Sequence, residues 1–249
     1  MIRRYTTYIT YALLLILLFV VSAGCGKDGI LKESGPVRSE IRELPVINQI
    51  ILYDKVNLIL TQDPLQQVRI EAGENLLADI ETSVSGNTVT IRDNNKYKWV
   101  RDLDTKVNVY ISAKAFEKID YYGAGDITST NELTPEKLTI DSWTGIGSFR
   151  LKVKTPQIML IIRTGNADII LEGSATFCSI YCADQGGIDL RDLVAPSVAI
   201  NHRSVRDAFI NVTTVLEANI LYTGNVYYRG SPQNINLTTS SSGRLVKTP

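Results

Sequence analysis

The chain has 249 residues, with 26 Lys and Arg side chains against 26 Asp and Glu, one His and three Cys. The length fits one β-rich domain or two small domains, and the zero formal charge argues against a nucleic-acid partner, which normally meets a basic face. Apolar residues at 44% and charged residues at 21% exclude a wholly disordered chain, and three Cys are too few for a disulfide framework.

The start of the chain has the three-part plan of a secretory signal. Arg3 and Arg4 supply the positive charge, and residues 11–21 form an apolar run shorter than the ~20 residues that span a bilayer. Small residues at positions 22–24 then lead to Cys25, which resembles a bacterial lipobox, where the Cys is lipidated and becomes the mature N-terminus. An ordinary signal peptide with a coincidental Cys, or an uncleaved anchor, is the alternative.

We therefore expect residues 1–24 to be a lipoprotein signal peptide and Cys25 to hold the chain in the outer membrane, on the periplasmic side or at the cell surface. Removing 24 residues would leave 225, with 24 basic and 26 acidic side chains, because the signal holds two Arg and no acid. Residues 25–40 are rich in Gly, Ser, Pro and charge, which predicts a flexible tether. Residues 41–249 are expected to form a single all-β domain.

The dominant period after residue 41 is two, as in strands, and not 3.6. A turn at Ser85-Gly86-Asn87 between two alternating runs predicts a β-hairpin, and residues 74–80 offer one short helical turn. Strands are predicted at residues 55–62, 67–72, 87–92 and 105–112.

Glycines repeat at a nearly fixed period in the second half. They stand at Gly123, Gly145, Gly165, Gly186, Gly224 and Gly243. The separations are 22, 20, 21, 38 and 19 residues, and Ser204 stands where the 38-residue gap lacks a glycine. A period near 20 predicts a parallel β-solenoid, whose units bury their apolar faces only by stacking. An antiparallel β-sandwich with regular hairpins is the alternative.

A family resemblance accompanies this pattern. Residues 71–92, 107–111 (VNVYI) and 123–127 (GAGDI) resemble the autotransporter-adhesin head GIN domain family, a former domain of unknown function common in Bacteroidetes lipoproteins. The similarity covers about residues 41–245. It implies a β-helix-like stack, an exported or surface location and no established catalysis.

Few residues are candidates for catalysis or metal binding. Cys178 and Cys182 are expected to be buried core thiols on one strand face, and no His cluster accompanies them to build a zinc site. Neither a metal nor a cofactor is predicted. His202 is the only His, and the chain has no Gly-x-Ser-x-Gly nucleophile elbow.

The acidic residues leave three alternatives open. Asp126 and Asp168 hold equivalent positions after their turns with Ser148 between them, while Asp184, Asp189 and Asp192 surround Gly186-Gly187. Asp caps backbone N–H groups in turns, and this is the interpretation that we favour. Calcium binding and polysaccharide cleavage by grouped carboxylates are the other two.

A candidate binding edge lies two residues before each turn glycine or its equivalent. In a solenoid with matched coils these side chains would stack along one edge, and aromatic rings mixed with polar groups could hold a glycan. Alternatively, some of them point into the core. The six residues are Tyr121, Trp143, Arg163, Asp184, His202 and Tyr222.

These observations predict a non-catalytic cell-envelope lipoprotein whose adhesin-like solenoid binds a glycan or a surface protein. A structural or assembly component of the envelope is the first alternative. A polysaccharide-degrading enzyme that uses residues 184–192 is the second. No nucleic-acid partner is expected, and the oligomeric state is left open.

Overall fold

The computed structural model of the chain describes residues 34–95 and 106–249, so the predicted signal and Cys25 lie outside the described residues. Among the described residues no helix is long and apolar enough to cross a membrane. Their strands are β1 (Val37–Glu43), β2 (Gln49–Leu52), β3 (Val56–Gln62), β4 (Gln67–Gly73), β5 (Ile80–Ser85), β6 (Thr88–Asp93), β7 (Val107–Ala113), β8 (Lys118–Tyr121), β9 (Ile127–Ser129), β10 (Lys137–Ser142), β11 (Ser148–Ile162), β12 (Asp168–Asp184), β13 (Gly187–Ser204), β14 (Ala208–Ile220), β15 (Val226–Arg229), β16 (Asn234–Thr239) and β17 (Leu245–Lys247).

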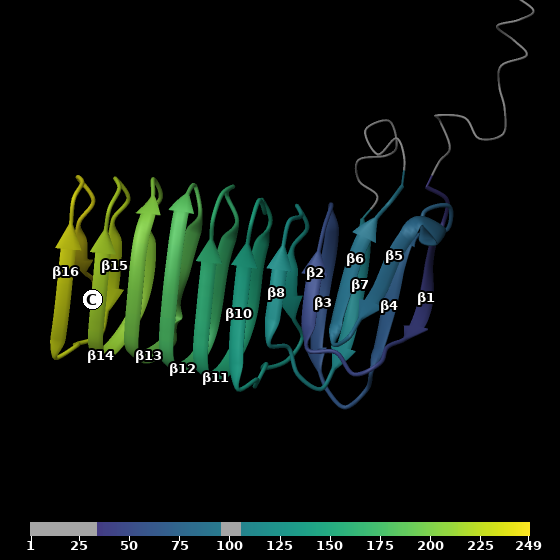
Figure 1. Cartoon of the computed structure of the whole chain (residues 1–249), viewed down its shortest axis with the longest axis horizontal. Helices are drawn as coiled ribbons and strands as arrows, with labels where there is room; N and C mark the ends of the chain where they lie inside the picture. The colour runs from purple at the N-terminus through teal and green to yellow at the C-terminus, as the bar shows by residue number, and fades with distance from the viewer. Residues whose placement is uncertain (1–33, 96–105) are drawn as a thin grey trace, which may run out of the picture.

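The strands form a parallel β-solenoid of coils about 20 residues long, which confirms the predicted fold (Figure 1). Each coil crosses two sheets. The first sheet runs through β6, β2, β8, β10, the later halves of β11–β14 and β16, and the second runs through β7, β3, β9, the earlier halves of β11–β14, β15 and β17. Strands β11 to β14 are long enough to contribute to both sheets, and each bends from one sheet into the other.

Alternating side chains build the core between the two sheets. Ile158 pairs with Cys178, Cys178 with Val198, and Val198 with Leu216, and all four are buried. Matching positions therefore stack into continuous apolar rows. Each fully buried Ile or Leu contributes about 1.5–3 kcal/mol relative to an exposed one, so the rows bind neighbouring coils together.

The N-terminal end departs from the parallel plan. β1 pairs antiparallel with β4, which pairs antiparallel with β7, and β5 forms a hairpin with β6. The hairpin turns at Gly86, which has a φ of 60°, as its sequence predicts. The expected helical turn at residues 74–80 is a single 3-10 turn, Leu77–Asp79.

Turn glycines allow consecutive coils to approach closely. A Cβ added at Gly125 would lie 1.9 Å from the carbonyl oxygen of Val56, and one at Gly147 would lie 2.2 Å from that of Gly125. Ser204 fills the position that lacks a glycine. Its Oγ donates to the carbonyl oxygen of Gly186 at 2.9 Å and accepts from the N–H of Arg206 at 3.0 Å. The serine thus supports its turn by hydrogen bonds.

Replacing Gly125 with Ala should destabilise the solenoid, because the methyl group would collide with the backbone of the preceding coil. We expect the free energy of unfolding to fall by about 3 kcal/mol, measured by urea denaturation. Gly86→Asn is the matched control, since Asn tolerates positive φ and an added Cβ there meets no atom within 4 Å. Equal stability of the two variants would contradict the close-packing argument.

Candidate binding surface

A row of stacked aromatic and guanidinium groups lies at the end of the first-sheet strands. Tyr53 and Tyr122 stack with ring centroids 4.8 Å apart, and Tyr122 and Trp143 stack at 5.9 Å. The Arg92 guanidinium lies 3.7 Å from the centroid of the Tyr53 ring, and that of Arg163 lies 4.1 Å from the Trp143 centroid. We call these five residues the aromatic ridge.

Strand register creates the ridge. Leu52 pairs with Tyr121, Tyr121 with Ser142, and Ser142 with Ile162, and these four residues are buried. The next residue of each strand faces outward, so the ring or guanidinium of one coil comes to rest on that of its neighbour. Parallel strands about 4.8 Å apart match the stacking distance of aromatic rings.

Two largely buried carboxylates lie next to the ridge, on β8 and β10. Asp141 is 7% exposed and accepts two hydrogen bonds from Arg163, both at 2.8 Å, which raise the pKa of the Arg163 guanidinium. Its neighbour in register, Asp120, pairs with Lys118 at 2.7 Å. Partial burial and these carboxylates raise the pKa of Tyr122, so its hydroxyl remains a hydrogen-bond donor at neutral pH.

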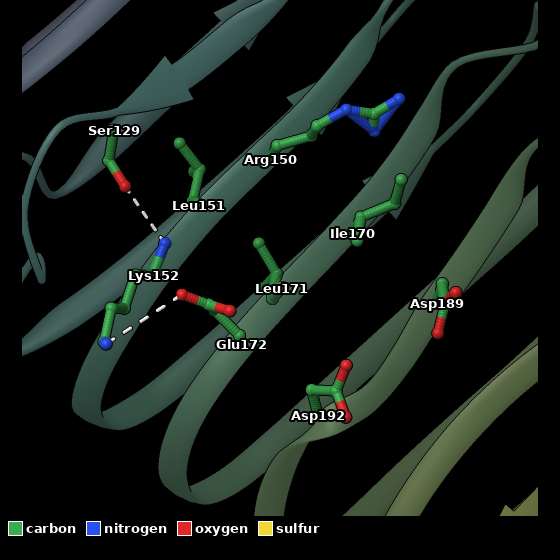
Figure 2. Close-up of a pocket in the computed structure, with 9 residues that line it drawn as sticks. All are labelled: Ser129, Arg150, Leu151, Lys152, Ile170, Leu171, Glu172, Asp189 and Asp192. Carbon is green, nitrogen blue, oxygen red and sulfur yellow. Dashed lines mark hydrogen bonds and ion pairs between the residues drawn. The ribbon is translucent and has the colours of Figure 1, made fainter.

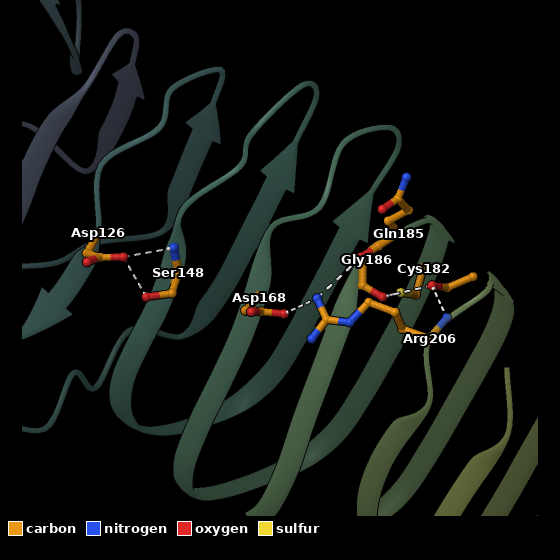
Figure 3. A network of polar contacts seen from close by, with 8 residues as sticks. Asp126, Ser148, Asp168, Cys182, Gln185, Gly186 and Arg206 are labelled. Atoms are coloured by element: carbon orange, nitrogen blue, oxygen red, sulfur yellow. Dashed lines mark hydrogen bonds and ion pairs between the residues drawn. The ribbon is translucent and has the colours of Figure 1, made fainter.

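A second polar row lies where the second-sheet strands begin (Figure 3). The N–H and Oγ of Ser148 donate to Asp126 Oδ1 at 3.1 and 2.7 Å, and Asp168 pairs with Arg206 at 2.6 Å. Gly187 is next in register, and the Asp168 carboxylate and the Arg206 guanidinium occupy the space that its side chain would take. The N–H contact of Asp126 agrees with the favoured interpretation of these carboxylates as backbone caps, whereas Asp168 pairs with the Arg206 side chain. Within the described ranges no three His, Cys, Asp or Glu side chains are grouped to hold a metal ion.

A groove of about 310 Å³ lies on the outer face of the second sheet (Figure 2). Arg150 and Lys152 line it on β11, and Asp189 and Asp192 line it on β13. Arg191 binds Asp189 and lowers the pKa of that carboxyl, which favours the ionised form over a general acid.

The acidic cluster predicted around Gly186-Gly187 is divided in the structure. Asp184 does not line the groove that contains Asp189 and Asp192. Its carboxylate accepts a hydrogen bond from the N–H of Gly165 at 2.9 Å, where it supports the preceding turn.

The six residues of the predicted edge do not form one exposed line. Trp143 and Arg163 are exposed and adjacent on the aromatic ridge. Tyr121 and His202 are completely buried, so these two follow the alternative in which some of the six residues point into the core. The other two are exposed but lie off the ridge: Asp184 is the last residue of β12, two positions beyond the partner of Ile162, and Tyr222 lies in a turn.

Variable turn length explains this difference. Gly123 follows the buried Tyr121 by two residues, whereas Gly145 follows the buried Ser142 by three. Counting back from each glycine therefore selects an inward residue in one coil and an outward residue in the next.

A family model described as "Putative auto-transporter adhesin, head GIN domain" matches residues 47–232. The chain belongs to this family. The predicted resemblance is therefore confirmed over most of the described residues, and the head GIN domain here is the solenoid itself. Among proteins with curated descriptions, none matches the chain.

Solved structures share the fold of this head GIN domain. A "putative adhesin" from Bacteroides fragilis is 22% identical, with a TM-score of 0.81, over 87% of this chain and 100% of that one. A "putative adhesin" from Parabacteroides merdae is 17% identical, with a TM-score of 0.66, over 88% and 99%. A "putative lipid binding protein" from Parabacteroides distasonis is 17% identical, with a TM-score of 0.66, over 88% and 100%. At these identities the likeness shows the fold alone.

The glycine spacing does not predict three ridge residues of the head GIN domain. Arg92 and Tyr53 precede the first glycine of the repeat, and counting two residues back from Gly123 selects Tyr121 rather than Tyr122. A better signal is the outward residue that directly follows each alternating apolar run. Aligning the runs rather than the glycines would place Tyr53 and Tyr122 beside Trp143.

The inward row of buried residues that precede the ridge residues on each strand is not placed for catalysis. The Tyr121 hydroxyl donates to the carbonyl oxygen of Gly125 at 2.7 Å and accepts from the N–H of Gly147 at 3.1 Å, and burial raises its pKa. Burial also raises the pKa of Cys178 and of Cys182 to about 12. Both thiols are therefore protonated at neutral pH, and their predicted place in the core is confirmed.

His202 occupies the same inward row in a later coil. Its two ring nitrogens make no well-formed hydrogen bond with any described residue. Burial lowers the pKa of the imidazole, although backbone groups of Arg206 and Gly224 and the charge of Asp207 oppose the shift. The neutral ring is thus the form that the core accepts.

Acidification should therefore weaken the head GIN domain through His202. Below the ordinary pKa of 6.5 the unfolded chain binds a proton that the folded chain resists, so the free energy of unfolding falls as pH decreases from 6.5 toward the lower folded-state pKa. We expect His202→Leu to remove this component, whose slope is at most about 1.4 kcal/mol per pH unit. Urea denaturation of both proteins between pH 7.5 and 5 measures it. Parallel stability curves would contradict the assignment.

Proposed function

We propose that the chain is a non-catalytic, lipid-anchored module of the cell envelope that holds a glycan or a surface protein on its aromatic ridge. The observation that carries this proposal is the ridge itself, an ordered row of large side chains on the outer surface. Trp143, at its centre, is 40% exposed although it is stacked on one side and covered by Arg163 on the other. Membership of an adhesin family supports a binding role.

The ridge offers its ring edges rather than its ring faces. Stacking covers the faces of Tyr53, Tyr122 and Trp143, whereas phenol hydroxyl, indole N–H and guanidinium groups belong to the ring edges and the terminal Arg residues. Such groups donate hydrogen bonds to sugar hydroxyls or to peptide carbonyls. The stacked neighbours hold each ring in place, so binding orders few side chains and loses little conformational entropy.

The carboxylates near this surface are engaged by neighbouring cations. Asp141 accepts two hydrogen bonds from Arg163, and Asp120 pairs with Lys118. The Asp141 contact holds the Arg163 guanidinium in one orientation over Trp143, which supports a preformed binding surface.

A tether would place the ridge away from the membrane. β1 begins at Val37, twelve residues after Cys25, and the intervening sequence is rich in Gly and charge. Lipid at Cys25 would then leave the solenoid free to reorient beside the outer membrane, on its periplasmic or outer side.

Trp143→Ala should weaken ligand binding by at least about tenfold, because it interrupts the ridge at its most exposed ring. Glycan arrays and pull-downs with the purified full chain identify the ligand, and titration of that ligand measures the change. Tyr222→Ala is the matched control, because Tyr222 is 49% exposed but lies off the ridge. A ligand that binds the Trp143 variant as tightly as the unaltered chain would refute the ridge as the site.

Cys25→Ala should release the protein from membranes, because the side chain that would carry the lipid is lost. Fractionation of expressing cells, with mass spectrometry of the mature N-terminus, tests this. Lys27→Ala keeps the Cys and should remain membrane-bound and lipidated. Protease treatment of intact cells then distinguishes the periplasmic from the external face. Unchanged membrane attachment of the Cys25 variant would disprove lipidation as the anchor.

A further inference from the structure

At the N-terminal end of the solenoid, the edge strand β1 of the second sheet is protected against further strands. Glu40 and Arg42 of β1 pair in register with the buried Ile70 and Val68, so charged residues stand at inward positions. Arg42 also donates to the carbonyl oxygen of Ile80 at 2.7 Å and thereby joins the last strands of the two sheets. Inward charges of this kind discourage another strand from adding to an edge.

The C-terminal end of the first sheet has no such protection. β16 pairs with β14 on one side, and no described strand pairs with its other side. Ile235 and Leu237 continue the buried rows of Leu216 and Ala218, yet they are 41% and 50% exposed. The strand contains neither a charged residue nor a proline. It therefore presents free backbone groups and apolar side chains at the spacing of one more strand.

Charge restricts what can cover this end. Glu217 is the last acidic residue of the sequence, and Arg229, Arg244 and Lys247 follow it. All three cations are exposed, and Lys247 pairs in register with Tyr228 at the open end of the second sheet. A second copy approaching end to end would bring two such groups of cations together. A partner with carboxylates would meet an attractive field instead.

We propose that β16 accepts an extended acidic segment of another protein as an added β-strand. Main-chain hydrogen bonds to the free edge would supply affinity, apolar side chains would cover Ile235 and Leu237, and carboxylates would approach Arg244 and Lys247. In Figure 1, β16 lies at the opposite end of the solenoid from β2 and β6, next to which the aromatic ridge begins. The two surfaces can therefore be occupied at the same time and tested separately.

Fluorescence anisotropy of a labelled peptide with the full chain in detergent tests the proposal. The probe is a peptide of about eight residues in which Val and Glu alternate, a length that matches an ordinary strand. We expect it to bind at least about tenfold more tightly than the corresponding Val–Lys peptide. Methylation of alternate backbone nitrogens should weaken binding by a similar factor, because one edge of the peptide then cannot donate hydrogen bonds.

A charge reversal provides the matched comparison. Arg244→Glu combined with Lys247→Glu should make the Val–Lys peptide the tighter ligand, whereas Lys137→Glu with Lys154→Glu, on exposed residues of earlier coils, should leave the original preference intact. Equal binding of the methylated and unmethylated peptides would overturn the proposal. So would self-association in sedimentation that disappears on Leu237→Lys, because it would assign the edge to a second copy.

Discussion

Matched stacking of coils is the constraint on which the rest of the structure depends. Parallel pairing places each residue above its counterpart about 20 residues away. Side chains at matched positions therefore form rows along the stacking axis. Inward positions become apolar rows, outward positions become the aromatic ridge, and strand starts become the polar row that contains Asp126 and Asp168. Glycine at the turns is required by the same constraint, because the Cβ that Gly125 lacks would enter the preceding coil.

The repeating architecture could be predicted because it leaves two independent signals in the sequence. Alternation defined the strands, and glycine spacing defined the coil length. Which residues near each turn point inward could not be predicted, because the number of residues between the last inward side chain and the turn glycine varies. Tyr121 and His202 were therefore counted with the candidate edge although both are buried. Tyr53 was missed because it precedes the glycine repeat, and Tyr122 because the count from Gly123 stopped at its neighbour Tyr121.

The aromatic ridge depends on contacts of several kinds that reinforce one another. Asp141 orients Arg163, Arg163 covers Trp143, and Trp143 stacks on Tyr122. The exposed ion pair adds little stability by itself, since Arg163 is well exposed to water. Its consequence is positional, because a bidentate guanidinium has one orientation and fixes the ring beneath it. A surface built in this way presents its donors in a nearly fixed pattern.

The position of the ridge near the N-terminal end determines how the solenoid would carry mechanical load. Hydrogen bonds between parallel strands run along the stacking axis. Tension on that axis therefore separates the strands one after another. Tension between the start of β1 and a ligand on Trp143 would pass through the first few strands of the stack (Figure 1). The long strands β12, β13 and β14 lie beyond that path and would stay folded while the ligand is pulled. In this domain, resistance to force would be set by the strands between β1 and β10 and not by the overall length of the stack.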